Sequence, residues 1–168
     1  FRVVTLTAGG RLAGRVLDAL AEATADAPGV TRVAYGPGER FAHDLVRREA
    51  EKLGATARVD AAGNLYLTLK GRNPDLPAIV IGSHLDSVPH GGNFDGAAGV
   101  VAGLAVMVEL VGQDIQLPRD LILMVTRAEE AVWFPLSYPG SQAALGLLEP
   151  QALEARRSDS GRTLADHM

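Results

Sequence analysis

The chain has 168 residues, of which 47% are apolar and 21% charged, which is enough apolar material for the core of one ordinary domain. Its net charge is −4 with acids and bases interspersed, so nothing in it argues for a nucleic acid or a membrane as partner. The absence of cysteine excludes disulfides and thiolate metal sites, and leaves His, Asp and Glu as possible metal ligands. It is also compatible with a reducing compartment, and we expect a cytoplasmic protein.

The first part of the chain predicts two helices. Residues 11–26 are amphipathic, with Leu12, Val16 and Leu20 spaced four apart on one face. A second helix is expected from about Pro37 to Leu53, because proline suits a first helical turn and Gly54 follows as a C-cap.

The period then changes to that of strands. A short extended segment at 57–60, a turn at 62–64 and alternating apolar residues at 65–69 predict a hairpin whose second strand is half exposed. The continuous apolar runs at 77–82 and 121–125 predict strands buried on both faces.

Further helices complete the pattern, at about 96–111 and in two short segments that start near Ser141 and Glu149. Gly99 and Gly103 in the first of these would allow it to pack closely against a sheet. The order of elements predicts an α/β fold, with a central mixed sheet flanked by helices on both sides.

Chemistry-bearing residues stand where apolar runs stop: His84 with Asp86, then Asp95, then Glu129 with Glu130. Residues two apart on a strand point to the same side, so Asp86 can accept the second imidazole N–H of His84 and orient it toward a metal. Each group also has an ordinary structural explanation, as a hydrogen-bonded pair, a helix N-cap and solvated surface acids respectively. At the end of a buried strand, however, adjacent glutamates would be unfavourable without a compensating cation.

Five motifs in this order resemble those of the zinc-dependent aminoacylase/carboxypeptidase-type (M20) amidohydrolases. The resemblance is closest to the group of N-carbamoyl-L-amino-acid hydrolases, allantoate amidohydrolases and β-ureidopropionases, and runs from about residue 11 to the end. The motifs are Gly29-Val30-Thr31-Arg32-Val33-Ala34-Tyr35, Val59-Asp60-Ala61-Ala62-Gly63-Asn64-Leu65, Gly82-Ser83-His84-Leu85-Asp86-Ser87-Val88-Pro89, Gly91-Gly92-Asn93-Phe94-Asp95-Gly96 and Gly140-Ser141.

The resemblance implies a role for each site residue. His84 would bind one zinc ion, Asp95 would bridge two, and Glu130 would bind the second. Glu129 would be the general base, and Asp86 the acid that orients His84. The peptide bond after Asp95 is expected to be cis, and manganese, cobalt or nickel could replace zinc at such oxygen and nitrogen ligands.

The chain also departs from the family pattern. Relatives place Gly and then Arg after the glutamate pair, where this chain has Ala131-Val132-Trp133. We interpret Trp133 as a core residue, and the substrate-binding residues stay unknown. His43 is expected on a helix surface, His90 in a loop near the site, and His167 is not assigned as a ligand.

The resemblance also implies that residues 1–168 are the N-terminal portion of a catalytic domain. The start at Phe1, and the helix-like pattern at 162–168, favour a truncated chain. The inserted dimerisation (lid) domain, two further histidine ligands and a carboxylate-binding arginine would lie outside it, so the parent protein would be a homodimer.

The expected activity is metal-dependent hydrolysis of the C–N bond of N-carbamoyl amino acids or related linear ureido amides. The parent protein would carry it out on a small-molecule amide, while the 168-residue chain alone would be inactive. Two alternatives stay open: an aminoacylase or metallopeptidase of the same superfamily, and a non-catalytic fragment.

Overall fold

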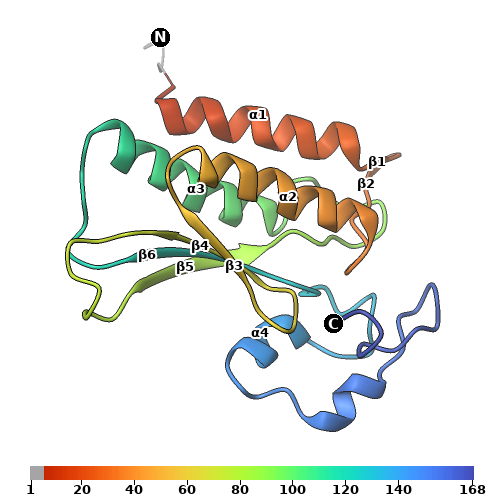
Figure 1. Ribbon diagram of the computed structural model, residues 1–168. Helices are drawn as coiled ribbons and strands as arrows, with labels where there is room; N and C mark the ends of the chain where they lie inside the picture. Colours follow the sequence, from red (N-terminus) through yellow and green to blue (C-terminus); the bar gives the residue numbers. More distant parts are fainter. Residues whose placement is uncertain (1–5) are drawn as a thin grey trace.

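A computed structural model describes residues 6–168, so Phe1 lies outside the described residues. Within that range the chain alternates between helices and strands and ends in a long segment of turns (Figure 1). The helices are α1 (Ala8–Ala23), α2 (Pro37–Glu51), α3 (Ala97–Gly112), α4 (Pro139–Ala144) and a 3-10 helix at Pro150–Glu154. The strands are β1 (Ala25–Asp26), β2 (Gly29–Val30), β3 (Thr56–Val59), β4 (Leu65–Leu69), β5 (Ile79–His84) and β6 (Leu121–Thr126).

The central sheet is mixed, as the sequence predicts. Its strand order is β3-β4-β6-β5, with β5 and β6 parallel and the other two pairs antiparallel. In the parallel pair, Ile79 faces Leu121 at one end and His84 faces Thr126 at the other. The loops that leave β5 and β6 therefore start from the same end of the sheet, where the carboxyl ends of both strands lie. Strands β1 and β2 form a separate two-stranded ribbon.

Helices α1, α2 and α3 cover one face of the sheet, and the short α4 lies at the other (Figure 1). The face that α1 buries is the one its spacing predicts, because Leu12, Val16 and Leu20 are all in the core. These three side chains belong to the core between the helices and the sheet, which also contains Leu104 and Leu123, both fully buried.

Helix α3 lies directly against β5 and β6, which explains why it contains glycine. A β-carbon added at Gly103 would lie 2.7 Å from a methyl carbon of Leu123, so a larger residue would require the Leu123 side chain to shift. The helix is strongly apolar because its other sides meet α1 and α2. Across residues 6–168, no helix combines the length and the hydropathy needed to cross a membrane.

The prediction that both apolar strands are buried on two faces is wrong. Strand β5 is an edge strand, with Ile79 41% and Val80 56% exposed. In β6 the side chains alternate, so that Leu123 is buried whereas Ile122 and Met124 on the opposite face are half-buried. The physical reason is that α1, α2 and α3 cover a single face of the sheet within the described residues.

The C-terminal part folds against a second apolar cluster and contains the short α4, close to the helix expected near Ser141, but no helix at 162–168. This cluster contains Tyr35, Trp133, Phe134 and Leu164. The segment expected to be helical at 162–168 consists of turns and a single bridge, and the segment after Glu149 is a 3-10 helix. Contacts with distant aromatic side chains, and not local periodicity, determine this part of the structure.

Candidate hydrolytic site

The five predicted site residues come from three stretches of chain that meet at the end of the sheet where the carboxyl ends of β5 and β6 lie. His84 is the last residue of β5, and Asp86 follows it by two positions. Glu129 and Glu130 follow the neighbouring strand β6, and Asp95 lies just before α3. Because β5 and β6 are parallel, their carboxyl ends are adjacent, as in other open α/β sheets where ligands bind at that edge.

Asp86 is the fully buried centre of this arrangement. One of its carboxylate oxygens lies 3.3 Å from Nδ1 of His84, as the two-residue spacing predicts. The same carboxylate accepts hydrogen bonds from the backbone N–H of Glu129 at 3.1 Å and of Glu130 at 2.9 Å. Asp86 therefore fixes both the imidazole and the glutamate pair, and the second of these contacts was not predicted.

The other ring nitrogen of His84 faces the remaining acids. Nε2 lies 3.8 Å from Oδ1 of Asp95 and 3.5 Å from Oε2 of Glu129. Glu130 does not come within ion-pair distance of His84. His84, Asp95 and Glu129 thus lie together, whereas the roles of these residues, and of Glu130 as a metal ligand, stay predictions.

Negative charge is in excess at this edge. Burial acts to lower the pKa of His84, but the hydrogen bond and the charge of Asp86, together with the charges of Glu129 and Glu130, raise it overall. Burial raises the pKa of Glu130, and repulsion from Asp95 raises it further. A cation placed among these carboxylates would lower the raised pKa values of both His84 and Glu130, since it offsets the negative charge around them.

The side chains fit part of a metal site. Two atoms bound to one zinc ion at about 2.0–2.2 Å lie roughly 3–4 Å apart, and the distances from Nε2 of His84 to Asp95 and to Glu129 fall in that range. Between residues 6 and 168, however, no three His, Asp or Glu side chains form a complete ligand set around one ion. The donor chemistry suits a divalent cation, and the number of ligands is short of a closed site.

Comparison with known proteins agrees with this chemistry. The family model described as peptidase family M28 matches residues 64–157, more than half of the chain. The chain is 39% identical over 140 residues to the N-carbamoyl-L-amino acid amidohydrolase of Geobacillus stearothermophilus, and 34% identical over 141 residues to the allantoate amidohydrolase of Bacillus subtilis. These alignments cover 83% of this chain and 34% of each relative.

A solved structure gives the same result. The crystal structure of a hydantoinase/carbamoylase family amidase from Burkholderia ambifaria superimposes with a TM-score of 0.88 at 35% identity, over 95% of this chain and 39% of that one. The chain belongs to the hydantoinase/carbamoylase family of amidases. The group predicted from the motifs is thereby confirmed, although the matching family model carries the M28 designation and not M20. The chain spans about a third of the length of the curated relatives it matches.

Two charged residues that the sequence did not single out, Glu39 and Arg127, fix the start of the loop that carries Glu129 and Glu130. Glu39, in the first turn of α2, is fully buried and accepts hydrogen bonds from Nη1 of Arg127 at 2.6 Å and from the backbone N–H of Ala128 at 3.4 Å. Ala128 has a φ of +52°, and it directly precedes Glu129. The only available signal was an acid near a helix N-terminus, which is common at helix starts and did not indicate this contact.

Trp133 is buried, and its indole N–H donates to the backbone oxygen of Ser87 at 2.8 Å. The interpretation of Trp133 as a core residue is confirmed. The prediction for His43 is wrong, because this histidine is 4% exposed and faces Glu39. His90 lies in the loop as expected, where its Nδ1 contacts Asp26.

Gly96 is in contact with the site histidine. Its φ of +63° and ψ of −51° place it at the centre of a tight turn in which the N–H of Ala97 donates to the backbone oxygen of Asp95 at 2.6 Å. The cis peptide bond expected after Asp95 is not present, because the cis bond within residues 6–168 is Ala27-Pro28. The positive φ of Gly96, and not a cis bond, makes the turn into α3.

We expect Gly96→Ala to displace the imidazole of His84. The added β-carbon would lie 2.5 Å from Cε1 and 2.6 Å from both ring nitrogens, in a backbone conformation that disfavours alanine. Together these effects should lower the free energy of unfolding by about 2–5 kcal/mol, measured by chemical denaturation. Gly92→Ala is the matched control, because a β-carbon there meets no atom within 4 Å. Equal stability of the two variants would contradict the prediction.

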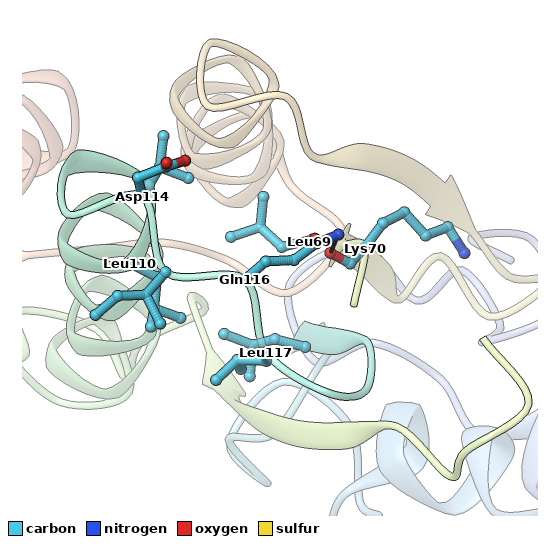
Figure 2. Close-up of a pocket in the computed structure, with 9 residues that line it drawn as sticks. Leu69, Lys70, Leu110, Asp114, Gln116 and Leu117 are labelled. Atoms are coloured by element: carbon cyan, nitrogen blue, oxygen red, sulfur yellow. Dashed lines mark hydrogen bonds between the residues drawn. The ribbon is translucent and has the colours of Figure 1, made fainter. Parts of the chain in front are cut away.

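A hollow of about 270 Å³ lies at the opposite end of the sheet (Figure 2). Leu69 and Lys70 at the end of β4, Leu110 of α3, and Gln116 and Leu117 before β6 line it. Leu69 pairs with Leu121 at the start of β6, so the strands separate this hollow from His84 and Glu129. It therefore does not contribute to the candidate site.

Proposed function

We propose that the whole protein of which this chain is part hydrolyses the C–N bond of N-carbamoyl amino acids or related linear ureido amides. The observation that carries the proposal is the convergence of His84, Asp95 and Glu129 at the carboxyl ends of two parallel strands. Membership of the hydantoinase/carbamoylase family supports the substrate class, because relatives are named for N-carbamoyl-L-amino acids and for allantoate, which both carry a ureido group.

The side chains have distinct roles in this proposal. His84 would hold one divalent ion through Nε2, since Nδ1 faces Asp86. Asp95 would bridge two ions and Glu130 would hold the second, with zinc as the first choice and manganese, cobalt or nickel as alternatives. When bound, such ions polarise a substrate carbonyl and lower the pKa of a coordinated water.

Glu129 is the proposed general base. Its backbone is fixed by Asp86, and its side chain is 33% exposed, so it can meet both water and substrate. It would take a proton from the attacking water and return it to the leaving nitrogen of the amino acid. For a carbamoyl substrate, one water molecule then yields the free amino acid, carbon dioxide and ammonia.

The proposal also concerns the architecture of the whole protein. Since the chain spans about a third of its relatives, we place the remaining metal ligands, the lid domain that mediates dimerisation and the arginine for the substrate carboxylate in further polypeptide. Residues 1–168 would then be the N-terminal portion of the catalytic domain.

A substrate panel tests the proposed activity. The intact protein, loaded in turn with zinc, manganese, cobalt or nickel, is assayed with N-carbamoyl amino acids, allantoate, ureidopropionate, N-acetyl amino acids and dipeptides. We expect the highest kcat/KM with a ureido substrate. A preference for N-acetyl amino acids or dipeptides would favour an aminoacylase or a metallopeptidase instead.

The role of Glu129 gives a sharper prediction. Glu129→Gln in the intact protein should lower kcat by about 10²–10⁴-fold with little change in KM, because it removes a general base and keeps the shape of the side chain. Glu149→Gln, at an exposed position, is the matched control and should leave kcat unchanged. A Glu129→Gln enzyme with undiminished kcat would remove this residue from the mechanism.

The isolated 168-residue chain should show weak zinc binding and negligible turnover. His84, Asp95 and Glu130 leave each ion with too few protein ligands, and metal affinity falls with each ligand that is missing. Calorimetric titration with zinc and an assay on the preferred substrate check this. Turnover by the chain at the rate of the intact protein would show that these residues suffice.

A further inference from the structure

Arg32 is a buried charge that the proposed chemistry does not use. It follows β2 and is 0% exposed, and across residues 6–168 no carboxylate lies within ion-pair distance of its guanidinium. A fully buried guanidinium without a direct carboxylate partner is unusual, because the desolvation of a buried charge is normally offset by an adjacent opposite charge. Its contacts therefore require an explanation.

The guanidinium joins two of the stretches that carry site residues. Its Nε donates to the backbone oxygen of Leu85 at 2.6 Å, and Leu85 stands between His84 and Asp86. Its Nη1 donates to the side-chain oxygen of Asn93 at 3.1 Å, and Nη2 to the backbone oxygen of Asn93 at 3.4 Å. Asn93 is two residues before Asp95.

Further contacts fix both ends of this link. The backbone N–H of Arg32 donates to the hydroxyl of Ser87 at 2.9 Å, and the N–H of Ser87 donates to the backbone oxygen of Arg32 at 3.0 Å. The amide of Asn93 donates to the backbone oxygen of Leu17 in α1 at 2.9 Å. Arg32 is therefore held by the segment after β5, and Asn93 by the helical layer.

The acids of the site offset only part of the effect of burying Arg32, because its pKa stays below the ordinary value overall. Burial lowers the pKa of Arg32, while the charges of Asp86 and Asp95 raise it, and both acids lie on the stretches that the guanidinium joins. A guanidinium keeps its charge at every ordinary pH. Its planar fork can donate in two directions at once, which the single ammonium of lysine cannot reproduce in the same geometry.

We propose that Arg32 is a positioning residue of the hydrolytic site, whose guanidinium holds the segment of His84 and Asp86 at a fixed separation from the turn that carries Asp95. The inference rests on the proposed function for the meaning of the site, and on the hydrogen bonds of Arg32 for the link itself. Arg32 touches neither substrate nor metal in this role. It sets the distance between ligands that lie on different loops.

Arg32→Lys keeps the charge and removes the planar fork, and Asn93→Ala removes the side-chain oxygen that accepts from Nη1 while the backbone oxygen that accepts from Nη2 stays. In the intact protein we expect either change to accelerate hydrogen exchange at the amides of Ser87, Ala97 and Ala98 at least tenfold, while amides of the β4–β6 ladder change less than twofold. The affinity of the metal-free protein for Mn²⁺ alone should fall about 10–100-fold in both variants. The double variant should be no weaker than the weaker single variant, because both break one link. Arg15→Lys, on the exposed side of α1, is the matched control.

The two readouts separate the possible failures. A merely structural role would accelerate exchange in the β4–β6 ladder as well as at the site, which would overturn the proposal. Unchanged Mn²⁺ affinity in variants with faster local exchange would also overturn it, because ligand placement would then not depend on Arg32. If the unaltered protein does not bind Mn²⁺, the titration is made with Zn²⁺; if it binds neither ion, the proposed function fails, and the exchange data still decide whether the link exists. If Arg32→Lys does not fold, Asn93→Ala carries the same test.

Discussion

Asp86→Ala is expected to lower the free energy of unfolding by roughly 3–5 kcal/mol and to weaken metal binding about 10–100-fold. The loss of stability arises because the backbone N–H groups of Glu129 and Glu130 would lose their acceptor in a partly buried loop, at a cost of about 1–3 kcal/mol each. The loss of metal affinity arises because Nδ1 of His84 would lose the carboxylate and keep only its contact with the backbone oxygen of Asp86 at 3.2 Å. Urea denaturation and a metal titration of the same samples measure both effects.

The isosteric variant Asp86→Asn distinguishes shape from charge. Its side-chain oxygen can still accept one of the two backbone N–H groups, so the loss of stability should be about half as large. Asp75→Ala, at an exposed position in the loop before β5, should change stability by less than about 0.5 kcal/mol. A similar effect of Asp75→Ala and Asp86→Ala would show that Asp86 does not organise the loop.

Glu39→Ala is the second change with a large expected effect, again about 3–5 kcal/mol of stability. The substitution would leave Arg127, whose side chain is 13% exposed, without its carboxylate partner. It would also remove the acceptor of the backbone N–H groups of Tyr35 and Ala128. Thermal and urea denaturation measure the effect, and Glu51→Ala, at the exposed C-terminal end of the same helix, is the control. A loss below about 1 kcal/mol for Glu39→Ala would contradict the importance of this ion pair.

Glu39 should also make stability depend on pH. Burial raises its pKa to about 7, against the opposing effects of Arg127 and of the Tyr35 N–H, from an ordinary value of 4.5. The folded state then binds a proton more tightly than the unfolded state, so the contribution of Glu39 is fully present below pH 4.5 and is lost as the pH rises through about 7. Glu39→Gln lacks this titration, so the stability of the unaltered protein relative to this variant should fall across that window.

His43 acts in the opposite direction. Burial holds its pKa well below 6.5, so the stability it contributes falls as the pH drops below that value. The two effects partly cancel in the unaltered protein, and the difference between Glu39→Gln and the unaltered protein isolates Glu39. Denaturation at half-unit steps from pH 4.5 to 8 gives this difference, and a difference that does not vary with pH would contradict the raised pKa of Glu39.

The residues that the sequence could place are those whose contacts follow from strand geometry. The two-residue spacing of His84 and Asp86 predicts that their side chains point to the same side, and they do meet. His84 and Glu129 both follow long apolar runs, and the parallel pairing of those runs brings the two side chains together. These contacts need only the strands and their direction.

The supporting residues could not be placed in this way. Arg32 reaches Asn93 across 61 positions, and Glu39 reaches Arg127 across 88 positions. No local spacing encodes such contacts, which depend on how the helical layer seats on the sheet. The exposure of β5 was missed for a related reason, because an apolar run such as Ile79-Val80-Ile81 does not show how many layers cover a strand.

The polarity of the sheet has a practical consequence. Every candidate site residue ends a strand, follows one or precedes α3, whereas the loops at 70–78 and 113–120 lie at the far end of the sheet, beside the hollow of Figure 2. A fluorescent label attached near Asp75 would therefore report on the protein without entering the region where substrate and cations would sit. Sequence insertions in these two loops should be tolerated on the same grounds, which makes them the natural positions for engineering handles into this scaffold.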